Sequence, residues 1–190
     1  KYTRSITFPV DINPSKCPQL TFTLWVKATT TYQTMFVIGN GTDKYTRGLI
    51  LENEDNIYRF GANCGKDGVL WGSPLVDGWT FVAVMYDSKN QEVRMVINDQ
   101  AYASRGTARS GEEKAFVGAL NGAIDDIRFF DHILTQAEIE QISGKPITKD
   151  ADLLTIKDKY SYRERMKLEK ENKLIINGIY IIDKQEFTIT

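Results

Sequence analysis

Two adjacent aspartates, Asp125 and Asp126, offer the clearest chemistry in this 190-residue sequence. Successive side chains of a strand point to opposite faces, so one carboxylate would face inward and the other would face solvent or Arg128. An inward aspartate either accepts hydrogen bonds from backbone N–H groups or helps to ligate Ca²⁺, a hard cation that takes several oxygen ligands. Asp11 and Asn13 are candidates for further oxygen ligands. The sequence leaves the structural role and the metal role open.

Four aromatic side chains are candidates for contact with a sugar. A sugar site needs exposed rings that stack on the ligand, together with polar groups that fix its hydroxyls. The candidate ligand-binding residues, which lie in or near expected loops, are Tyr45, Tyr58, Trp71 and Tyr102. Packing in the core is the competing interpretation, and it is favoured for Trp71. The aromatic residues expected in the core are Trp25, Trp79, Phe22, Phe81, Phe116 and Phe129. The basic stretch of Arg105, Arg109 and Lys114 could meet an acidic partner, although a solvated loop is favoured.

Two further features have alternative interpretations. Cys17 and Cys64 either form one disulfide that closes a long loop or remain separate buried thiols, because sequence does not give the distance between them. Asn40, in Asn-Gly-Thr, fits the N-glycosylation pattern. Asn-Gly is also the preferred two-residue turn of a β-hairpin, and the sequence favours the turn. The two interpretations of Asn40 are compatible.

The composition excludes several classes of function. One histidine, His132, and two cysteines cannot supply the four ligands of a structural zinc, and His132 has no serine or cysteine near it in sequence. A net charge of -1 gives no general attraction to nucleic acid. No apolar run is long enough for a membrane span. Glycoside hydrolysis needs two carboxylates across the bond. Glu52 and Glu54 would share one strand face if a strand extended through both, but a turn is favoured at Asn53-Glu54-Asp55, so we predict no enzyme.

The elements that would position these residues are mostly strands. The run Leu20–Val26 alternates with period two, and Trp79–Tyr86 is apolar on both faces, as expected of a central strand covered on both sides. Other strand-like runs are Arg4–Val10, Met35–Ile38, Gly48–Glu52, Asn56–Phe60, Glu92–Ile97 and Ala123–Phe130. Many short strands separated by turns predict an all-β, two-sheet antiparallel β-sandwich of the jelly-roll type.

One short helix is expected over residues 135–143. Thr135 and Glu138 form a capping-box pattern, and Gly144 followed by Pro146 is a stop signal. Beyond this point the composition changes: 15 of the last 40 residues are charged, against 34 of the first 150. We therefore divide the chain into a jelly roll at 1–145 and an appendage at 146–190.

The appendage is expected to hold a charged connector helix and a β-hairpin. The charged segment 155–172 contains six basic and four acidic residues, which is typical of a solvated helix. The following run 174–182 has Asn177-Gly178 at its middle, which predicts a hairpin turn there. An isolated hairpin is only marginally stable, so it either completes the main sheets or begins a next module. Because position 1 is Lys and no signal-peptide core follows, we expect a processed chain or part of a longer protein.

Three stretches together resemble one family. Gly122–Phe130, followed by Leu134-Thr135 and Glu138-Ile139, resembles the closing strand and helix of the laminin-G-like, concanavalin A-like jelly-roll family. Phe22–Lys27 resembles its early strand with Trp-Val-Lys, and Gly78–Asp87 resembles its central strand. The resemblance covers roughly residues 4–144.

This resemblance implies a sandwich that binds glycans or proteins outside the cell or at its surface. Members often carry one structural Ca²⁺, for which the candidate ligands here are Asp125, Asp126 and Asp11. The leading hypothesis is therefore a non-catalytic binding module of a larger extracellular protein, with a glycan or protein ligand and with neighbouring domains as partners. The alternatives are an assembly subunit that docks through residues 145–190 and, less favoured, a glycan-cleaving enzyme.

Overall fold

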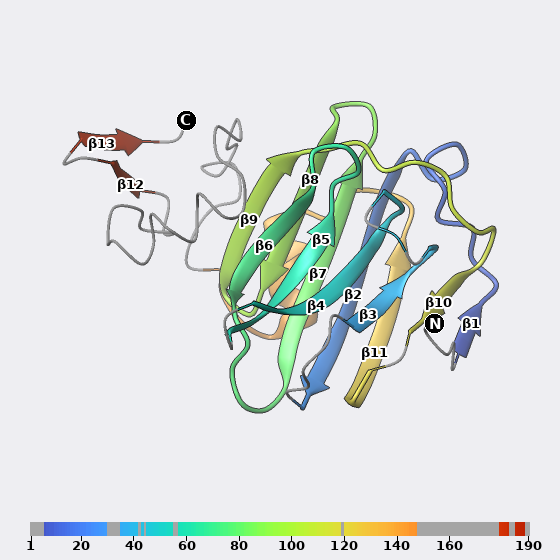
Figure 1. Cartoon of the computed structure of the whole chain (residues 1–190), viewed down its shortest axis with the longest axis horizontal. Helices are drawn as coiled ribbons and strands as arrows, with labels where there is room; N and C mark the ends of the chain where they lie inside the picture. The colour runs from blue at the N-terminus through green and yellow to red at the C-terminus, as the bar shows by residue number, and fades with distance from the viewer. Residues whose placement is uncertain are drawn as a thin grey trace.

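The computed structural model describes residues 6–29, 35–41, 43, 45–54, 57–118, 120–147, 179–182 and 185–188. Two antiparallel sheets pack face to face (Figure 1), which confirms the predicted sandwich. One sheet has six strands in the order β1 (Ile6–Phe8), β10 (Ala115–Val117), β3 (Met35–Gly39), β4 (Gly48–Glu54), β5 (Ile57–Asn63) and β6 (Val69–Pro74). The other has five strands in the order β11 (Gly122–Phe130), β2 (Gln19–Ala28), β7 (Thr80–Asp87), β8 (Glu92–Ile97) and β9 (Gln100–Arg105).

The main core lies between the sheets. The alternating residues of β2 place Phe22 and Leu24 inward, against Phe60 of the opposite sheet and Val84 of β7. All eight residues of β7 are buried, as expected for its apolar pattern. Its outer face is covered as well, because Phe81, Ala83 and Met85 belong to a second cluster with Leu134 and Ile139 of the helical segment. Central burial of β7 therefore depends on the segment that follows β11.

The helix α1 (Gln136–Ser143) has the caps that its sequence predicts. The Thr135 side chain accepts a hydrogen bond from the backbone N–H of Glu138, and the Glu138 carboxylate accepts from the backbone N–H of Thr135. Gly144 ends the helix in the left-handed conformation at φ 68°. No helix among the described residues is long and apolar enough to cross a membrane.

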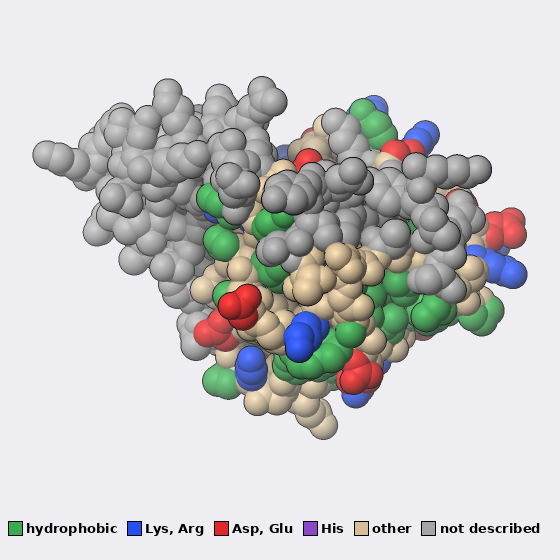
Figure 2. All heavy atoms as spheres, turned by 60° about the horizontal axis from the view of Figure 1, so that its bottom comes forward, with side chains coloured by type: hydrophobic (Ala, Val, Ile, Leu, Met, Phe, Trp, Pro, Cys, Tyr) green, Lys and Arg blue, Asp and Glu red, His purple; other side chains and the backbone are tan. Residues whose placement is uncertain are grey.

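Other parts of the chain correct the sequence-based expectations. Strands β6, β9 and β10 were not expected, because β6 and β9 mix polar with apolar residues and β10 has only three residues. Trp79 was expected in the core but is 44% exposed, because β7 begins only at Thr80. It lies in the β6–β7 loop together with Val76, which is 53% exposed. Figure 2 brings this end of the sandwich forward and shows hydrophobic side chains in separate patches among charged ones.

A pair of short strands lies near the C-terminus. β12 (Ile179–Ile182) pairs with β13 (Gln185–Thr188), which follows it in sequence. The expected turn residues Asn177-Gly178 and the charged segment 155–172 lie outside the described residues.

A buried arginine anchors one end of the sandwich. Arg47 is completely buried next to β4, and its guanidinium lies 5.3 Å from the centre of the Tyr86 ring. No carboxylate is among its hydrogen-bond partners in the described chain. It donates instead to the carbonyl oxygens of Ile12, Cys17 and Pro18 and to the Ser88 hydroxyl, at 2.5–3.4 Å. Burial lowers the pKa of Arg47 to about 10, which leaves it charged at neutral pH.

A connecting segment closes the same end. Residues Gly106–Lys114, which we call the strap, cross from β9 to β10 over the top of the sandwich in Figure 1. Backbone N–H groups of the strap donate to oxygens of several loops, namely Gly106 to Gln91, Thr107 to Cys64, Arg109 to Tyr45, Gly111 to Asn13 and Glu112 to Asn40. The contact is so close that a Cβ added at Gly65 would lie 1.7 Å from the carbonyl oxygen of Thr107.

The substitution Arg47→Met tests the anchor. It leaves several buried oxygens without a donor, so we expect a loss of about 3 kcal/mol in the free energy of unfolding, measured by urea denaturation. Arg105→Met is the matched control at an exposed arginine and should change stability by less than about 0.5 kcal/mol. Equal effects of the two substitutions would show that the buried guanidinium is not an anchor.

The substitution Gly65→Ala tests the contact between strap and loop. Gly65 has φ 69°, and its control Gly68 has φ 94° in the same loop, but a Cβ at Gly68 would meet nothing within 4 Å. Both changes to Ala cost about 1 kcal/mol for the positive φ. We expect Gly65→Ala to cost at least about 2 kcal/mol more, because the strap must move. Indistinguishable melting temperatures for the two variants would contradict this.

Candidate functional site

An exposed cluster, which we call the rim site, forms where the strap passes the β3–β4 loop. It consists of Asp43, Tyr45 and Arg109. The Arg109 guanidinium lies 5.5 Å from the centre of the Tyr45 ring, and its Nη2 is 2.5 Å from Asp43 Oδ2. The side chains of Arg109 and Asp43 are 63% and 44% exposed, and Tyr45 is 39% exposed. The rim site therefore presents an aromatic ring, a cation and a carboxylate to solvent on one surface.

Local hydrogen bonds fix these three residues. The backbone N–H of Tyr45 donates to Asp43 Oδ1 at 2.8 Å, and that of Arg109 donates to the Tyr45 carbonyl at 2.7 Å. The buried Asn63 amide donates to the Asp43 carbonyl at 3.2 Å. Burial by itself would raise the pKa of Asp43, but hydrogen bonds from Tyr45 and Arg109 together lower it. The Asp43 carboxylate is therefore ionised at neutral pH.

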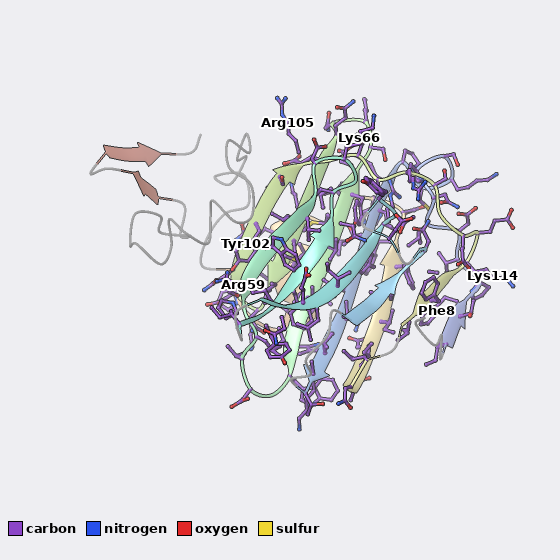
Figure 3. The ribbon with its side chains drawn as sticks, viewed as in Figure 1. Phe8, Arg59, Lys66, Tyr102, Arg105 and Lys114 are labelled. Atoms are coloured by element: carbon purple, nitrogen blue, oxygen red, sulfur yellow. The ribbon has the colours of Figure 1, made fainter. Side chains whose placement is uncertain are left out.

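The arrangement at the rim site suits a polar ligand that also has a flat face. A carboxylate accepts hydrogen bonds from hydroxyls, a guanidinium donates several, and an aromatic ring packs on an apolar face. Figure 3 shows two further basic side chains, Lys66 and Arg105, at the same end of the sandwich, and Lys114 where the strap reaches β10. The basic stretch of Arg105, Arg109 and Lys114 is thus exposed along one end of the molecule.

Of the four predicted ligand-binding aromatics, the structure leaves one well exposed. Trp71 and Tyr102 lie in strands and are 8% and 5% exposed, so neither ring offers a face to a ligand. The Tyr102 hydroxyl donates to Gln100 and accepts from the backbone N–H of Ser73, which links the two sheets at one edge. Tyr58 packs partly buried against the core. Only Tyr45 has the exposure that the hypothesis required.

The structure also bears on the predictions for Asn40 and for the two cysteines. Asn40 is fully buried, and its amide donates to Asn13 Oδ1 at 2.7 Å, so it cannot carry a glycan in the folded chain. Neither Asn40 nor Gly41 has a positive φ, and residues 40–47 form a longer loop in place of the expected two-residue turn. Cys17 and Cys64 are free thiols, and no disulfide joins them.

The predicted calcium ligands Asp125, Asp126 and Asp11 do not lie in one group. Asp125 is exposed, and its carboxylate accepts the backbone N–H of Asp126 at 2.8 Å. A register shift in β11 puts Asp126 at φ 49°, where its two oxygens pair with the Arg128 guanidinium at 2.7 and 2.8 Å. Asp11 accepts the backbone N–H of Asn13. In the described chain no group of three or more His, Cys, Asp or Glu is placed to hold a metal, and a structural Ca²⁺ stays a prediction.

The carboxylates considered for glycoside cleavage also differ from expectation. β4 continues through Glu54, so Glu52 and Glu54 are strand residues and not part of a turn. Pairing with β5 explains this, because Glu52 lies opposite Arg59 and Glu54 opposite Ile57. Arg59, labelled in Figure 3, is buried and donates to the Gly72 carbonyl at 3.2 Å.

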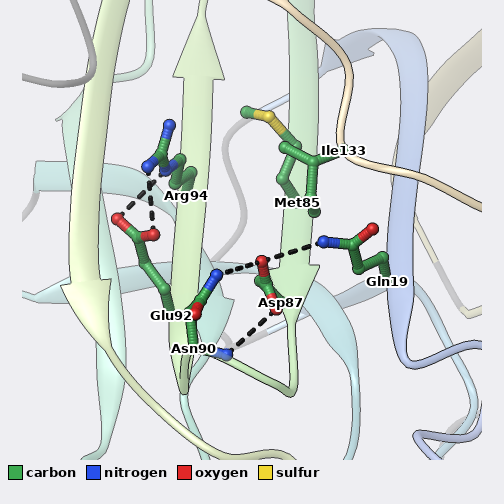
Figure 4. A pocket seen from close by; sticks show the side chains of 7 residues that line it. All are labelled: Gln19, Met85, Asp87, Asn90, Glu92, Arg94 and Ile133. Carbon is green, nitrogen blue, oxygen red and sulfur yellow. Dashed lines mark hydrogen bonds and ion pairs between the residues drawn. The ribbon is translucent and has the colours of Figure 1, made fainter.

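A second concave site, not expected from sequence, lies on the outer face of the five-stranded sheet. We call this cavity of about 120 Å³ the lateral pocket (Figure 4). Its lining residues are Gln19, Met85, Asp87, Asn90, Glu92, Arg94 and Ile133. Asp87 and Glu92 lie opposite each other on β7 and β8. Burial by itself would raise the pKa of Asp87, but hydrogen bonds from Asn90, Gln19 and Lys89 lower it overall. This carboxylate is therefore charged at neutral pH.

Comparison with known proteins gives the family. The chain belongs to the concanavalin A-like lectin/glucanase superfamily, whose Laminin_G_3 model matches residues 3–140. A heptameric SAP-like pentraxin from Limulus polyphemus aligns at 13% identity and a TM-score of 0.54, over 80% of this chain and 79% of that one. The likeness to the pentraxin shows the same fold.

Two further solved structures are similar at lower scores. The CBM40 of Ruminococcus gnavus IT-sialidase aligns at 13% identity and a TM-score of 0.49, over 76% of this chain and 97% of its own. Domains LG4-5 of the mouse laminin alpha1 chain align at 13% identity and 0.48, over 67% and 38%. A sequence search among curated proteins finds no match.

The acid side of the stability profile tests the charge of Asp87. Its folded pKa is below its unfolded value, so its contribution to stability is present above the unfolded value of about 3.9 and is lost as pH falls through the folded pKa. We expect Asp87→Asn to lose less stability than the wild type between pH 5 and pH 2, in urea titrations. Asp67→Asn, at an exposed loop residue, is the control. The prediction is wrong if the free energy of unfolding of Asp87→Asn falls between pH 5 and pH 2 as steeply as that of the wild type.

Proposed function

We propose that this chain is a non-catalytic module that binds a glycan at the rim site. The observation that supports this is the exposed Tyr45 ring fixed beside Arg109 and Asp43 at the end of the sandwich that the strap and Arg47 hold together. Sugar sites combine a ring that packs on the pyranose face with charged groups that bind its hydroxyls. The rim site has both, and rigid loops lower the entropic cost of binding.

The charge state of two described carboxylates, Asp43 and Asp87, agrees with a binding role without catalysis. Asp43 is paired with Arg109, and Asp87 accepts four hydrogen bonds, so both are kept ionised and neither is prepared to donate a proton. A glycosidase needs one carboxyl with a raised pKa to protonate the leaving group. The family includes lectins as well as glucanases, and the ionised state of Asp43 and Asp87 favours the lectin type of function here.

The setting of the module is part of the proposal. Extracellular or cell-surface location, within a larger protein, is the context that the laminin-G-like relationship favours. We also expect the residues after 145 to link the sandwich to neighbouring domains, because the β12–β13 pair is too small to be stable alone.

Glycan binding by two rim variants tests the function. On a glycan array, the wild type should bind at least one class of saccharide, and Tyr45→Ala should weaken that binding about 10-fold through loss of ring contact. Arg109→Gln should weaken it to a similar extent. Trp79→Ala is the matched control, since Trp79 is equally exposed but lies in the loop at the other end. Binding to no glycan, or equal loss in Trp79→Ala, would contradict the proposal.

A further inference from the structure

The lateral pocket has the size of a side chain. Its volume is about 120 Å³, which is below the roughly 150 Å³ of an engineered cavity that binds one benzene. An unbranched chain of about five heavy atoms fits this space. Met85 and Ile133 give the pocket an apolar side, along which methylene groups could lie (Figure 4).

The charge of the pocket is negative and its polar atoms are chiefly acceptors. The lining holds two carboxylates, Asp87 and Glu92, against one guanidinium, Arg94, which pairs with Glu92. Asp87 is already saturated, because it accepts from the Gln19 and Asn90 amides and from the backbone N–H groups of Lys89 and Asn90. Like charges directly opposite on neighbouring strands repel, so a further cation beside Asp87 and Glu92 would be stabilising.

Three side-chain oxygens of the lining residues accept no hydrogen bond in the described chain. Glu92 Oε1 is buried and lies 3.0 Å from Arg94 Nε, but it accepts no well-directed hydrogen bond. The side-chain oxygens of Gln19 and Asn90 accept none either, because both amides use their nitrogens to donate to Asp87. Asn90 is exposed and Gln19 is half-buried, so their oxygens are available to the donors of a ligand.

A primary ammonium on an alkyl chain matches these features together. It has three donors, no acceptor and one positive charge, and the four methylene groups of lysine can pack on Met85 and Ile133 while the head donates to the amide oxygens of Gln19 and Asn90 beside the two carboxylates. A planar guanidinium is a poorer match, because Arg94 already occupies that edge of Glu92. We propose that the lateral pocket binds a lysine side chain of a protein partner, a second binding site that is independent of the rim site.

NMR titration of the whole chain with Nα-acetyl-lysine methylamide tests the pocket. We expect saturable shifts of the Gln19 and Asn90 side-chain amides at millimolar concentration, as one side chain binds weakly. The Nε-acetylated probe, which has no charge, should bind at least 10-fold more weakly. Glycan binding at the rim site should be unchanged, so failure of either site can be distinguished from failure of the other.

Two pocket variants and one control test whether the lysine probe binds at the lateral pocket. Glu92→Gln should weaken lysine binding at least 10-fold, whereas Glu113→Gln, at an exposed strap residue, should leave it unchanged. Ile133→Ala keeps every charge and should weaken binding a few-fold by removing one apolar wall. The proposal is overturned if the two probes bind equally, if no pocket amide shifts, or if Glu92→Gln and Ile133→Ala, both folded, bind like the wild type.

Discussion

A guanidinium buried without a carboxylate is the constraint on which this structure depends. Arg47 is held by carbonyl oxygens of residues 12–18 and by Ser88, so it joins the first loop, β4 and the β7–β8 turn at one point. Removing a charge from water is costly unless it is hydrogen-bonded, and both terminal nitrogens of Arg47 are bonded to these loops, so the loops have few alternative conformations. The positions of both proposed binding sites follow from this, because each uses a loop that Arg47 or its partners hold.

The strap adds a second level of organisation to the same end. It is the connection from the five-stranded sheet to the six-stranded one, and its backbone contacts loops from four other parts of the chain. Close approach is possible because glycines stand at the contacts, as at Gly65 against Thr107 and Gly111 against Asn40. The Tyr45 ring and the Arg109 guanidinium come from segments more than sixty residues apart, yet they meet because the strap pairs there.

The fold was predictable where local pattern and tertiary environment agree. Alternation in β2, the two-sided apolar run of β7 and the caps of α1 each identified an element. The prediction failed where a residue far away in sequence determines the local conformation. Asn40-Gly41 signals a tight turn, but the Asn40 amide is buried and donates a hydrogen bond to Asn13. Likewise Tyr45 was a candidate from its loop position, whereas its pairing with Asp43 and Arg109 depends on contacts that no local pattern reports.

The irregularity in β11 has a consequence for the behaviour of the protein at high concentration. β11 is the outermost strand of its sheet, and a long flat strand in that position offers free backbone groups to other chains. The register shift at Asp125–Arg128 bends the strand, and the exposed Asp126–Arg128 pair adds charge there. Two molecules that meet at this edge therefore find a bent and charged strand, which disfavours a common sheet along β11.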